Sequence, residues 1–360
     1  PPPPEADTSA REPERARGAA DEERRVLTLS VFHPLATNAG TPDVRTILDV
    51  GLFYDRVGRS DALQLSTLGL AFASREIHGA QIGGLAAFSG GTADGVQLAV
   101  GATFARRGFR GVQMATGLDY AGGPARGVQL TAGVNVLGSA DGQEPGHLRG
   151  AQLSSILNLA AGGVRGTQIS AGVNVATDRV EGAQLAVLNV GGEVSGAQVG
   201  IVNIGRRVKG LQLGVVNLAE EVDGAAIGLA SIARDAIHPV AWGGNLAYTN
   251  VGVKFSTRHM YTVTAVGVGS PEHGFVGPSV TTAIGGHLPL VASFDVELEL
   301  AYSHLQDQSR TNQAFHARAL AGYSFARHLR LFAGAGPRFP IVFEEGRSVV
   351  RPEVLAGIQF

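Results

Sequence analysis

The chain has 360 residues and a formal net charge of −2, so its overall charge gives it no attraction to nucleic acid. It contains no cysteine, which excludes disulfide bonds, thiolate metal sites and cysteine nucleophiles. Its 51 glycines lack the Gly-X-Y period of collagen, and no run of 18 or more apolar residues predicts a membrane-spanning helix.

The N-terminal segment differs in composition from the rest of the chain. It begins with prolines and then mixes acidic and basic side chains densely, so we expect a disordered leader over residues 1–25. Residues 26–78 contain strand-like alternation of apolar and polar positions, and we expect them to form strands that lead into the next region.

Residues 79–235 repeat one short phrase, which begins Gly-x-Gln, continues with alternating apolar residues and often ends in Asn. Successive glutamines are 16, 16, 16, 23, 16, 16, 14 and 14 residues apart, and the step of 23 is one ordinary step plus an inserted loop. A fixed short period predicts a repeat architecture. The repeated amides are Gln81, Gln97, Gln113, Gln129, Gln152, Gln168, Gln184, Gln198, Gln212, Asn135, Asn158, Asn174, Asn189, Asn203 and Asn217.

The phrase from Gly127 to Val136 shows the local pattern. Apolar residues occupy every second position, which is typical of a β-strand. Glycine and charged residues separate one phrase from the next, as expected for turns. Each repeat therefore predicts about ten residues of strand followed by a turn. The residues between the apolar ones are Gln129, Thr131, Gly133 and Asn135.

Two architectures fit this unit. In a large antiparallel membrane barrel of about 18–20 strands, each phrase crosses the membrane once and its polar residues face the lumen. In a parallel β-solenoid over about residues 60–235, followed by an eight-stranded barrel, each phrase is one coil and glutamine stacks on glutamine. We favour the large barrel, because Gln near one end and Asn near the other let the phrase pair with a reversed copy of itself.

The pairing partner of Gln184 separates the two architectures. An antiparallel hairpin centred near Arg179 places Asn174 opposite Gln184, at about 5 Å. A parallel solenoid instead stacks Gln168 on Gln184, at about 4.8 Å, and Asn174 on Asn189.

Residues 236–360 regain aromatic side chains and form the predicted C-terminal barrel region. In the segment FDVELELAYSH, Phe294, Leu298 and Tyr302 share one face, while Glu297 and Glu299 share the other. A carboxylate face opposite an apolar face is typical of a barrel strand with a polar lumen. We predict eight strands, at residues 237–247, 248–257, 259–269, 276–288, 291–304, 313–325, 328–340 and 349–360.

The chain ends in the strand-like sequence VLAGIQF, and Phe360 is its last residue. A C-terminal strand that closes on phenylalanine resembles the assembly signal of bacterial outer-membrane barrels. The resemblance implies that Phe360 is read by the barrel-assembly machinery.

The repeats also resemble a family of bacterial envelope proteins that is built from Gly-x-Gln…Asn surface repeats. In that family, as in this chain, 16-residue units give way to 14-residue units before a β-rich C-terminal region. The resemblance covers about residues 30–360 and implies the surface or outer membrane of a Gram-negative cell. The family brings no established reaction, so it implies no catalytic residue.

Residue patterns that support catalysis are weak. Ser303 and His304 are adjacent, and adjacent residues of a strand point to opposite faces, so they do not form a nucleophile–base pair. Glu297 and Glu299 share a face and suit an acid–base pair, but we expect them to be solvated lumen charges. The repeated amides suit a ligand-binding array, yet hydrogen-bonded structural rows explain their recurrence better. We therefore expect no catalytic, cofactor-binding or metal-binding residue.

Two other groups of side chains have a membrane-related interpretation. The clusters Arg106, Arg107, Arg110 and Arg206, Arg207, Lys209 are expected in turns, where they are either solvated or in contact with anionic lipid headgroups. Trp242 is expected to anchor the barrel at the membrane interface.

These patterns predict an outer-membrane structural or surface-interaction protein of the Gram-negative cell envelope, without enzymatic activity. Its expected partners are outer-membrane lipid and the barrel-assembly machinery. A narrow pore for small solutes and a lipid-modifying barrel enzyme are the alternatives.

Overall fold

The computed structural model describes residues 23–360, except 141–143, 235, 246–248, 271–274, 292, 307–310, 327–328 and 342–348. The expected leader therefore lies almost entirely outside the described residues. The chain divides into two compact units, residues 1–162 and 163–360. The first holds the early coils of a β-solenoid, and the second holds the later coils and a β-barrel. No helix in the described part of the chain is long and apolar enough to cross a membrane.

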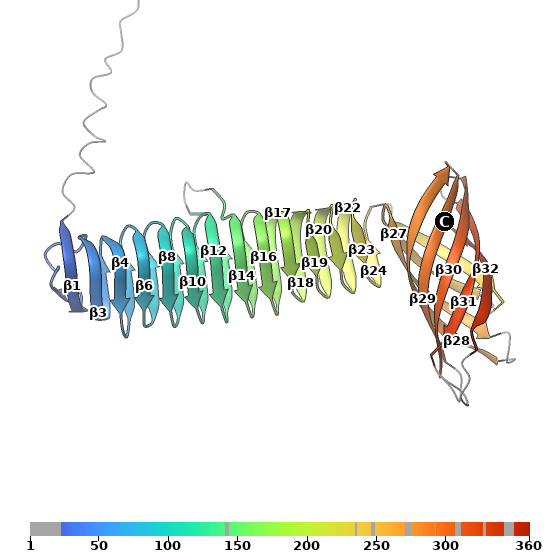
Figure 1. Ribbon diagram of the computed structural model, residues 1–360, viewed down its shortest axis with the longest axis horizontal. Helices are drawn as coiled ribbons and strands as arrows, with labels where there is room; N and C mark the ends of the chain where they lie inside the picture. The colour runs from blue at the N-terminus through green and yellow to red at the C-terminus, as the bar shows by residue number, and fades with distance from the viewer. Residues whose placement is uncertain are drawn as a thin grey trace, which may run out of the picture. The chain divides into compact units, whose positions relative to one another are not determined.

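Residues 45–232 form a parallel β-solenoid of about 12 turns. Each early coil has a longer strand, a sharp turn and a shorter strand, and each strand pairs in parallel with the equivalent strand of the next coil. Figure 1 shows such longer strands side by side. The longer strands are β4 (Arg59–Ser66), β6 (Ile77–Gly83), β8 (Ala93–Ala99), β10 (Phe109–Ala115), β12 (Ala125–Thr131), β14 (Leu148–Ser154) and β16 (Val164–Ser170).

The shorter strands form a second sheet in the same coils. They are β5 (Leu70–Ala73), β7 (Ala86–Ser89), β9 (Ala102–Ala105), β11 (Leu118–Ala121), β13 (Val134–Leu137) and β15 (Leu157–Ala160). β3 (Arg45–Val57) and β17 (Val173–Leu185) run through both sheets, and β1 (Arg24–Phe32) pairs in parallel with β3 and antiparallel with β2 (Leu35–Ala36). The later coils use β18 (Leu188–Val194), β19 (Ala197–Val199), β20 (Val202–Val208), β21 (Leu211–Leu213), β22 (Val216–Val222), β23 (Ala225–Ile227) and β24 (Ala230–Ile232).

The favoured prediction of one antiparallel barrel of 18–20 strands is wrong. Gln168 pairs with Gln184, and Asn174 pairs with Asn189, which is the arrangement expected of the solenoid. The physical reason is that all phrases run in the same sense, so parallel stacking places each amide against its own kind. A turn also bends each phrase, at residues 132–133 in the phrase that begins at Gly127, so that it forms two short strands.

The first glycine of the phrase is required by close packing between coils. Gly127 has φ of +131°, and a Cβ atom there would lie 1.9 Å from the carbonyl oxygen of Gly111 in the preceding coil. No L-residue with a side chain fits such an approach, and the backbone conformation itself favours glycine.

The bend also accounts for the change from 16-residue to 14-residue coils. Asn follows Gln by six residues in the early coils and by five in the late ones, as in Gln198 and Asn203. On a continuous strand an odd step would move Asn to the other face. Gln198 and Asn203 instead lie on β19 and β20, which a turn separates, and β19 ends one residue after its Gln where β12 ends two residues after, so both side chains stay inside.

The C-terminal strands form a closed antiparallel barrel, coloured orange to red in Figure 1. β25 closes the barrel by pairing with both β26 and β32. The prediction of eight strands over residues 237–360 is confirmed. The strands are β25 (Ile237–Gly244), β26 (Thr249–Ser256), β27 (Met260–Ser270), β28 (Phe275–Val291), β29 (Phe294–Gln306), β30 (Thr311–Ala326), β31 (Leu329–Pro340) and β32 (Arg351–Gln359).

Candidate functional site

The solenoid interior holds a row of stacked glutamine amides. The Nε2 atom of Gln129 donates to Oε1 of Gln113 at 2.9 Å, and Nε2 of Gln152 donates to Oε1 of Gln129 at 2.7 Å. The same bond recurs at Gln184, which donates to Gln168 at 2.7 Å. In these steps of the glutamine ladder the donor points to the preceding coil. All of the repeated glutamines are buried.

A second row of amides runs in the opposite direction. Nδ2 of Asn135 donates to Oδ1 of Asn158 at 2.8 Å, and Nδ2 of Asn189 donates to Oδ1 of Asn203 at 2.9 Å. Nδ2 of Asn217 ends this asparagine ladder on the hydroxyl of Ser231, at 3.1 Å. Here the donors point to the following coil. The two ladders line the interior with amides that bond one another and so hold the coils together.

Asp119 stands where the asparagine ladder begins, in the coil before that of Asn135. It occupies the position of Asn in its coil, pairs with Asn135 of the next coil, and accepts a hydrogen bond from the Thr103 hydroxyl at 2.5 Å. Its other oxygen and Oδ1 of Asn135 are both buried without a hydrogen-bond partner. Burial raises the pKa of Asp119 to about 6. At neutral pH the chain therefore buries a carboxylate where the ladder needs a donor.

We expect Asp119→Asn to stabilise the solenoid by about 3 kcal/mol at pH 7, since a pKa rise from 3.8 to about 6 is worth about 1.4 kcal/mol per unit. The new amide would donate to Oδ1 of Asn135. Urea unfolding followed by circular dichroism measures the change. In the wild type the folded state binds more protons than the unfolded state between about pH 4 and pH 6, so stability falls as pH rises through that window.

The gain from Asp119→Asn should accordingly disappear at pH 4, where the protonated carboxyl of the wild type can itself donate to Asn135. Asn158→Asp, which places a carboxylate at an equivalent position, is the matched control and should lose stability at pH 7. An Asp119→Asn variant with unchanged stability at pH 7 would contradict this account of the ladder.

The glutamine ladder ends near the N-terminus on two buried aspartates. Nε2 of Gln64 donates to Asp49 at 3.2 Å, and the Thr28 hydroxyl also donates to Asp49. Burial and the neighbouring charge of Asp49 raise the pKa of Asp55 to about 9, so Asp55 is neutral at pH 7. This end of the ladder thus places a neutral carboxyl group beside Asp49, whose pKa is itself raised by burial.

The barrel interior is lined by ion pairs. Lys254 on β26 lies 2.5 Å from Glu297 on β29, and Arg330 on β31 bonds Asp295 at 2.5 Å and approaches Glu297 at 3.1 Å. These strands are not neighbours in the barrel, so the ion pairs cross its interior, into which alternate residues of each strand point. The predicted carboxylate face of β29 is therefore the lumen face.

Arg318 on β30 holds a second group of charges. It bonds Glu299 through Nη1 at 2.9 Å, and it bonds Glu353 through Nε and Nη2, each at 2.9 Å. The Tyr261 hydroxyl also donates to Glu299 at 3.2 Å. The expectation that Glu297 and Glu299 are solvated is wrong, because both are buried and paired with cations.

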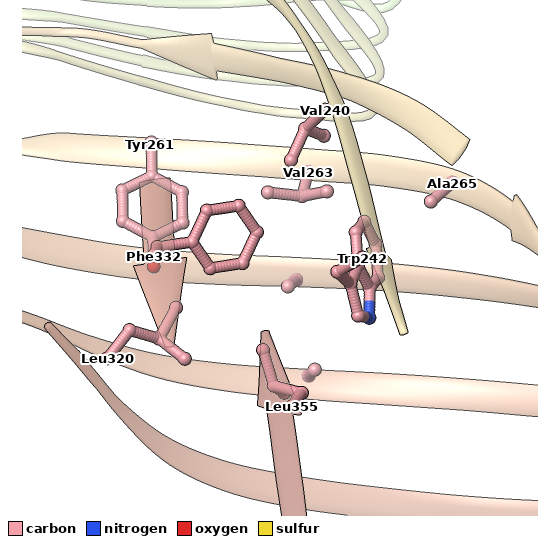
Figure 2. Close-up of a cluster of buried hydrophobic side chains, with 10 residues drawn as sticks. Val240, Trp242, Tyr261, Val263, Ala265, Leu320, Phe332 and Leu355 are labelled. Atoms are coloured by element: carbon pink, nitrogen blue, oxygen red, sulfur yellow. The ribbon is translucent and has the colours of Figure 1, made fainter. Parts of the chain in front are cut away.

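An apolar layer lies beside these charges inside the barrel. Figure 2 shows Tyr261, Phe332, Trp242, Leu320 and Leu355, which belong to one cluster of buried apolar side chains. Trp242 is buried, so its expected role as an interfacial anchor is wrong. It shares a strand face with Val240, which also points inward, and an interfacial tryptophan would need the opposite face.

The space that remains in this part of the barrel is small. A cavity of about 20 Å³ lies among Trp242, Glu297, Arg318 and Phe332, which is room for about one water molecule. Eight strands enclose a volume that side chains can fill.

Three polar side chains form a chain of hydrogen bonds that sequence reasoning missed. The Ser303 hydroxyl lies 2.8 Å from Nε2 of His316, and Nδ1 of His316 lies 2.7 Å from Glu353. Ser303 and His304 point apart, as expected, but strand pairing brings Ser303 beside a histidine of β30. This contact was predictable from the sequence, because a hairpin that joins residues 291–304 to residues 313–325 sets the strand register and therefore which histidine lies near Ser303.

No group of histidine and carboxylate side chains in the described ranges has an arrangement that holds a metal ion. Comparison with known protein families, with curated proteins and with solved structures finds no match for this chain.

Proposed function

We propose that residues 237–360 form an outer-membrane barrel that anchors the β-solenoid in the envelope of a Gram-negative cell. The observation that carries this proposal is the inverted polarity of the barrel. On β29, Leu298 is 61% exposed on the outside, whereas the adjacent Glu297 is 2% exposed on the inside.

The outward face of the barrel suits a lipid environment. Its large apolar side chains are exposed, and lipid is the solvent in which such exposure is favourable. A closed barrel also leaves no unpaired strand edge, which hydrocarbon requires. The exposed apolar side chains include Val251, Val266, Leu288, Leu298, Leu300, Phe315, Phe325, Leu331 and Val354.

The proposed role is structural or surface-interacting, without enzymatic activity, and the partners are outer-membrane lipid and the barrel-assembly machinery. The ion pairs of the lumen support a scaffold, since buried charges that are fully paired specify a packed interior. The alternative of a narrow pore gains no support from the small cavity among the lumen side chains.

Deletion of Phe360 is expected to lower the amount of folded protein in the outer membrane several-fold. The Phe360 ring is exposed, and its backbone N–H bonds the carbonyl of Pro239 at 2.9 Å across the seam between β25 and β32. The expected cause is loss of recognition during assembly. Expression in a Gram-negative host, followed by membrane fractionation and heat-modifiability on gels, measures the folded fraction.

Phe360→Tyr, which keeps an aromatic terminus, should assemble as the wild type does. Undiminished membrane insertion of the truncated chain would show that Phe360 is not an assembly signal. Absence of the wild-type protein from the outer-membrane fraction would contradict the membrane barrel itself.

Acyl-ester hydrolysis in the lipid phase is a second candidate, because Ser303, His316 and Glu353 have nucleophile, base and orienting geometry. The serine oxygen would attack the acyl carbonyl while His316 takes the hydroxyl proton and passes it to the departing alcohol, which leaves an acyl-serine ester. Water would then hydrolyse this ester, releasing the acid and restoring the serine hydroxyl. Against it, β29 is paired along both edges at Ser303, which leaves few backbone donors for an oxyanion.

A fluorophosphonate probe separates the two candidates. The anchor proposal expects no labelling of the folded wild type and no esterase rate above that of Ser303→Ala. Labelling that Ser303→Ala abolishes and Ser279→Ala retains would instead establish the hydrolase.

A further inference from the structure

In most solenoid coils, the turn that joins the two strands carries a large apolar side chain at its tip. Tips of turns in soluble proteins are normally polar or glycine. These side chains, which we call the apolar rim, are between 45% and 65% exposed. In residues 45–162 the rim consists of Leu68, Leu85, Val100 and Ile156, and in residues 163–232 it consists of Val187, Ile201, Val215 and Leu229.

The surface beside the rim is apolar as well. In the early coils an open groove of about 740 Å³ runs beside the rim. Ile82, Leu98, Met114 and Leu130, which come one residue after the stacked glutamines, line it together with small residues. Monomeric soluble proteins rarely expose apolar surface that continues from one repeat to the next.

Charged side chains occupy the other edge of the coils. Arg110, Arg126 and Arg149 each precede the first glycine of a phrase, at the start of β10, β12 and β14. In the later coils the charges of this edge pair between coils, as in Arg179 with Glu193 at 2.9 Å and Arg207 with Glu221 at 2.8 Å. Each coil therefore has one apolar edge and one charged edge.

The solenoid interior holds the amide ladders together with buried apolar side chains such as Phe109, Leu137 and Val180, while further large apolar side chains face outward at the rim. Backbone hydrogen bonds between successive coils satisfy the N–H and C=O groups of the strands, as contact with hydrocarbon requires. An element with an apolar side and an Arg-containing side suits the boundary between acyl chains and headgroups.

We propose that the apolar rim of the solenoid lies in the acyl region of a lipid leaflet, with its charged edge toward the headgroups and water. This goes beyond the anchoring role proposed for the barrel, because it makes the solenoid itself a membrane-seated element. Lipid fits the rim better than a protein partner does. The rim side chains vary in size and are interrupted by small residues at Ala132 and Ala171, which fluid acyl chains accommodate and a fixed complementary surface does not.

The absence of cysteine permits a direct test on the full chain. Three single variants, Ile201→Cys on the rim, Arg207→Cys on the charged edge and Leu298→Cys on the barrel exterior, are labelled with an environment-sensitive fluorophore. Each is reconstituted in vesicles of phosphatidylethanolamine and phosphatidylglycerol. Lipids with a nitroxide on the acyl chain then probe contact with hydrocarbon, and iodide probes contact with water.

Quenching of Ile201→Cys and Leu298→Cys by the nitroxide lipids, with Arg207→Cys quenched only by iodide, is the expected result. If the nitroxide lipids quench Leu298→Cys but do not quench Ile201→Cys, the rim proposal is overturned and the membrane-barrel proposal stands. Protection of Ile201→Cys from both quenchers would show that another copy of the chain covers the rim, which also overturns it. Failure of the nitroxide lipids to quench Leu298→Cys would count against the barrel proposal instead.

Discussion

Replacing Arg318 by methionine should destabilise the barrel by roughly 3–5 kcal/mol, which is the cost of leaving a buried charge without its partner. Arg318 is the cation that bonds both Glu299 and Glu353, so its loss leaves two buried carboxylates uncompensated. Trp242 is the single tryptophan of the chain and lies inside the barrel. Urea unfolding followed by tryptophan fluorescence therefore reports on the barrel alone.

The matched control removes the charges together. Arg318→Met combined with Glu299→Gln and Glu353→Gln should recover much of the lost stability, because no unpaired charge then remains in the interior. Arg207→Met, which breaks an exposed ion pair of the solenoid, should leave the fluorescence transition unchanged. A single Arg318→Met variant as stable as the wild type would mean that the lumen is hydrated and that its ion pairs do not hold the barrel.

Replacing Gln129 by leucine should destabilise the solenoid by roughly 2–6 kcal/mol. Gln129 donates to Gln113 and accepts from Gln152, so leucine leaves a buried acceptor on one side and a buried donor on the other. Each unsatisfied buried group costs about 1–3 kcal/mol. Circular dichroism and native-state hydrogen exchange should show the loss, centred on the coils of β10, β12 and β14.

Leu130→Gln is the matched control, because it makes the reverse exchange at the adjacent outward position. Its effect should stay within about 0.5 kcal/mol, as for most surface substitutions. Equal stability of Gln129→Leu and the wild type would show that apolar contacts, and not amide stacking, hold the coils in register.

The sequence predicted the repeat period and the eight barrel strands well, since period-2 alternation and turn residues determine both. It did not settle parallel against antiparallel pairing, because Gln and Asn near opposite ends allow Gln184 to pair with either Asn174 or Gln168. The turn inside each phrase escaped detection because the alternation continues through Ala132 and Gly133 without a break.

The barrel interior was predicted less completely than its strands. The lumen face of Glu297 and Glu299 followed from alternation, but their ion pairs depend on which strands meet across the barrel. The contact of Ser303 with His316 depends on strand register in the same way. The position of Trp242 was predicted wrongly, because the prediction relied on the usual interfacial position of tryptophan in membrane barrels and not on the apolar strand face that Trp242 shares with Val240.

The opposed directions of the two amide ladders have a consequence for how this molecule can change in length. The amide dipoles point toward the preceding coil in one ladder and toward the following coil in the other. They therefore cancel, and an added coil that carries both amides contributes no net side-chain dipole. Each coil that carries both Gln and Asn also offers its neighbours the same donors and acceptors. Removal of residues 196–209 would bring Gln212 onto Gln184 and Asn189 onto Asn217 with both ladders unbroken. The length of the solenoid can thus be changed in steps of one coil by duplication or deletion of a single repeat, with no redesign of either end.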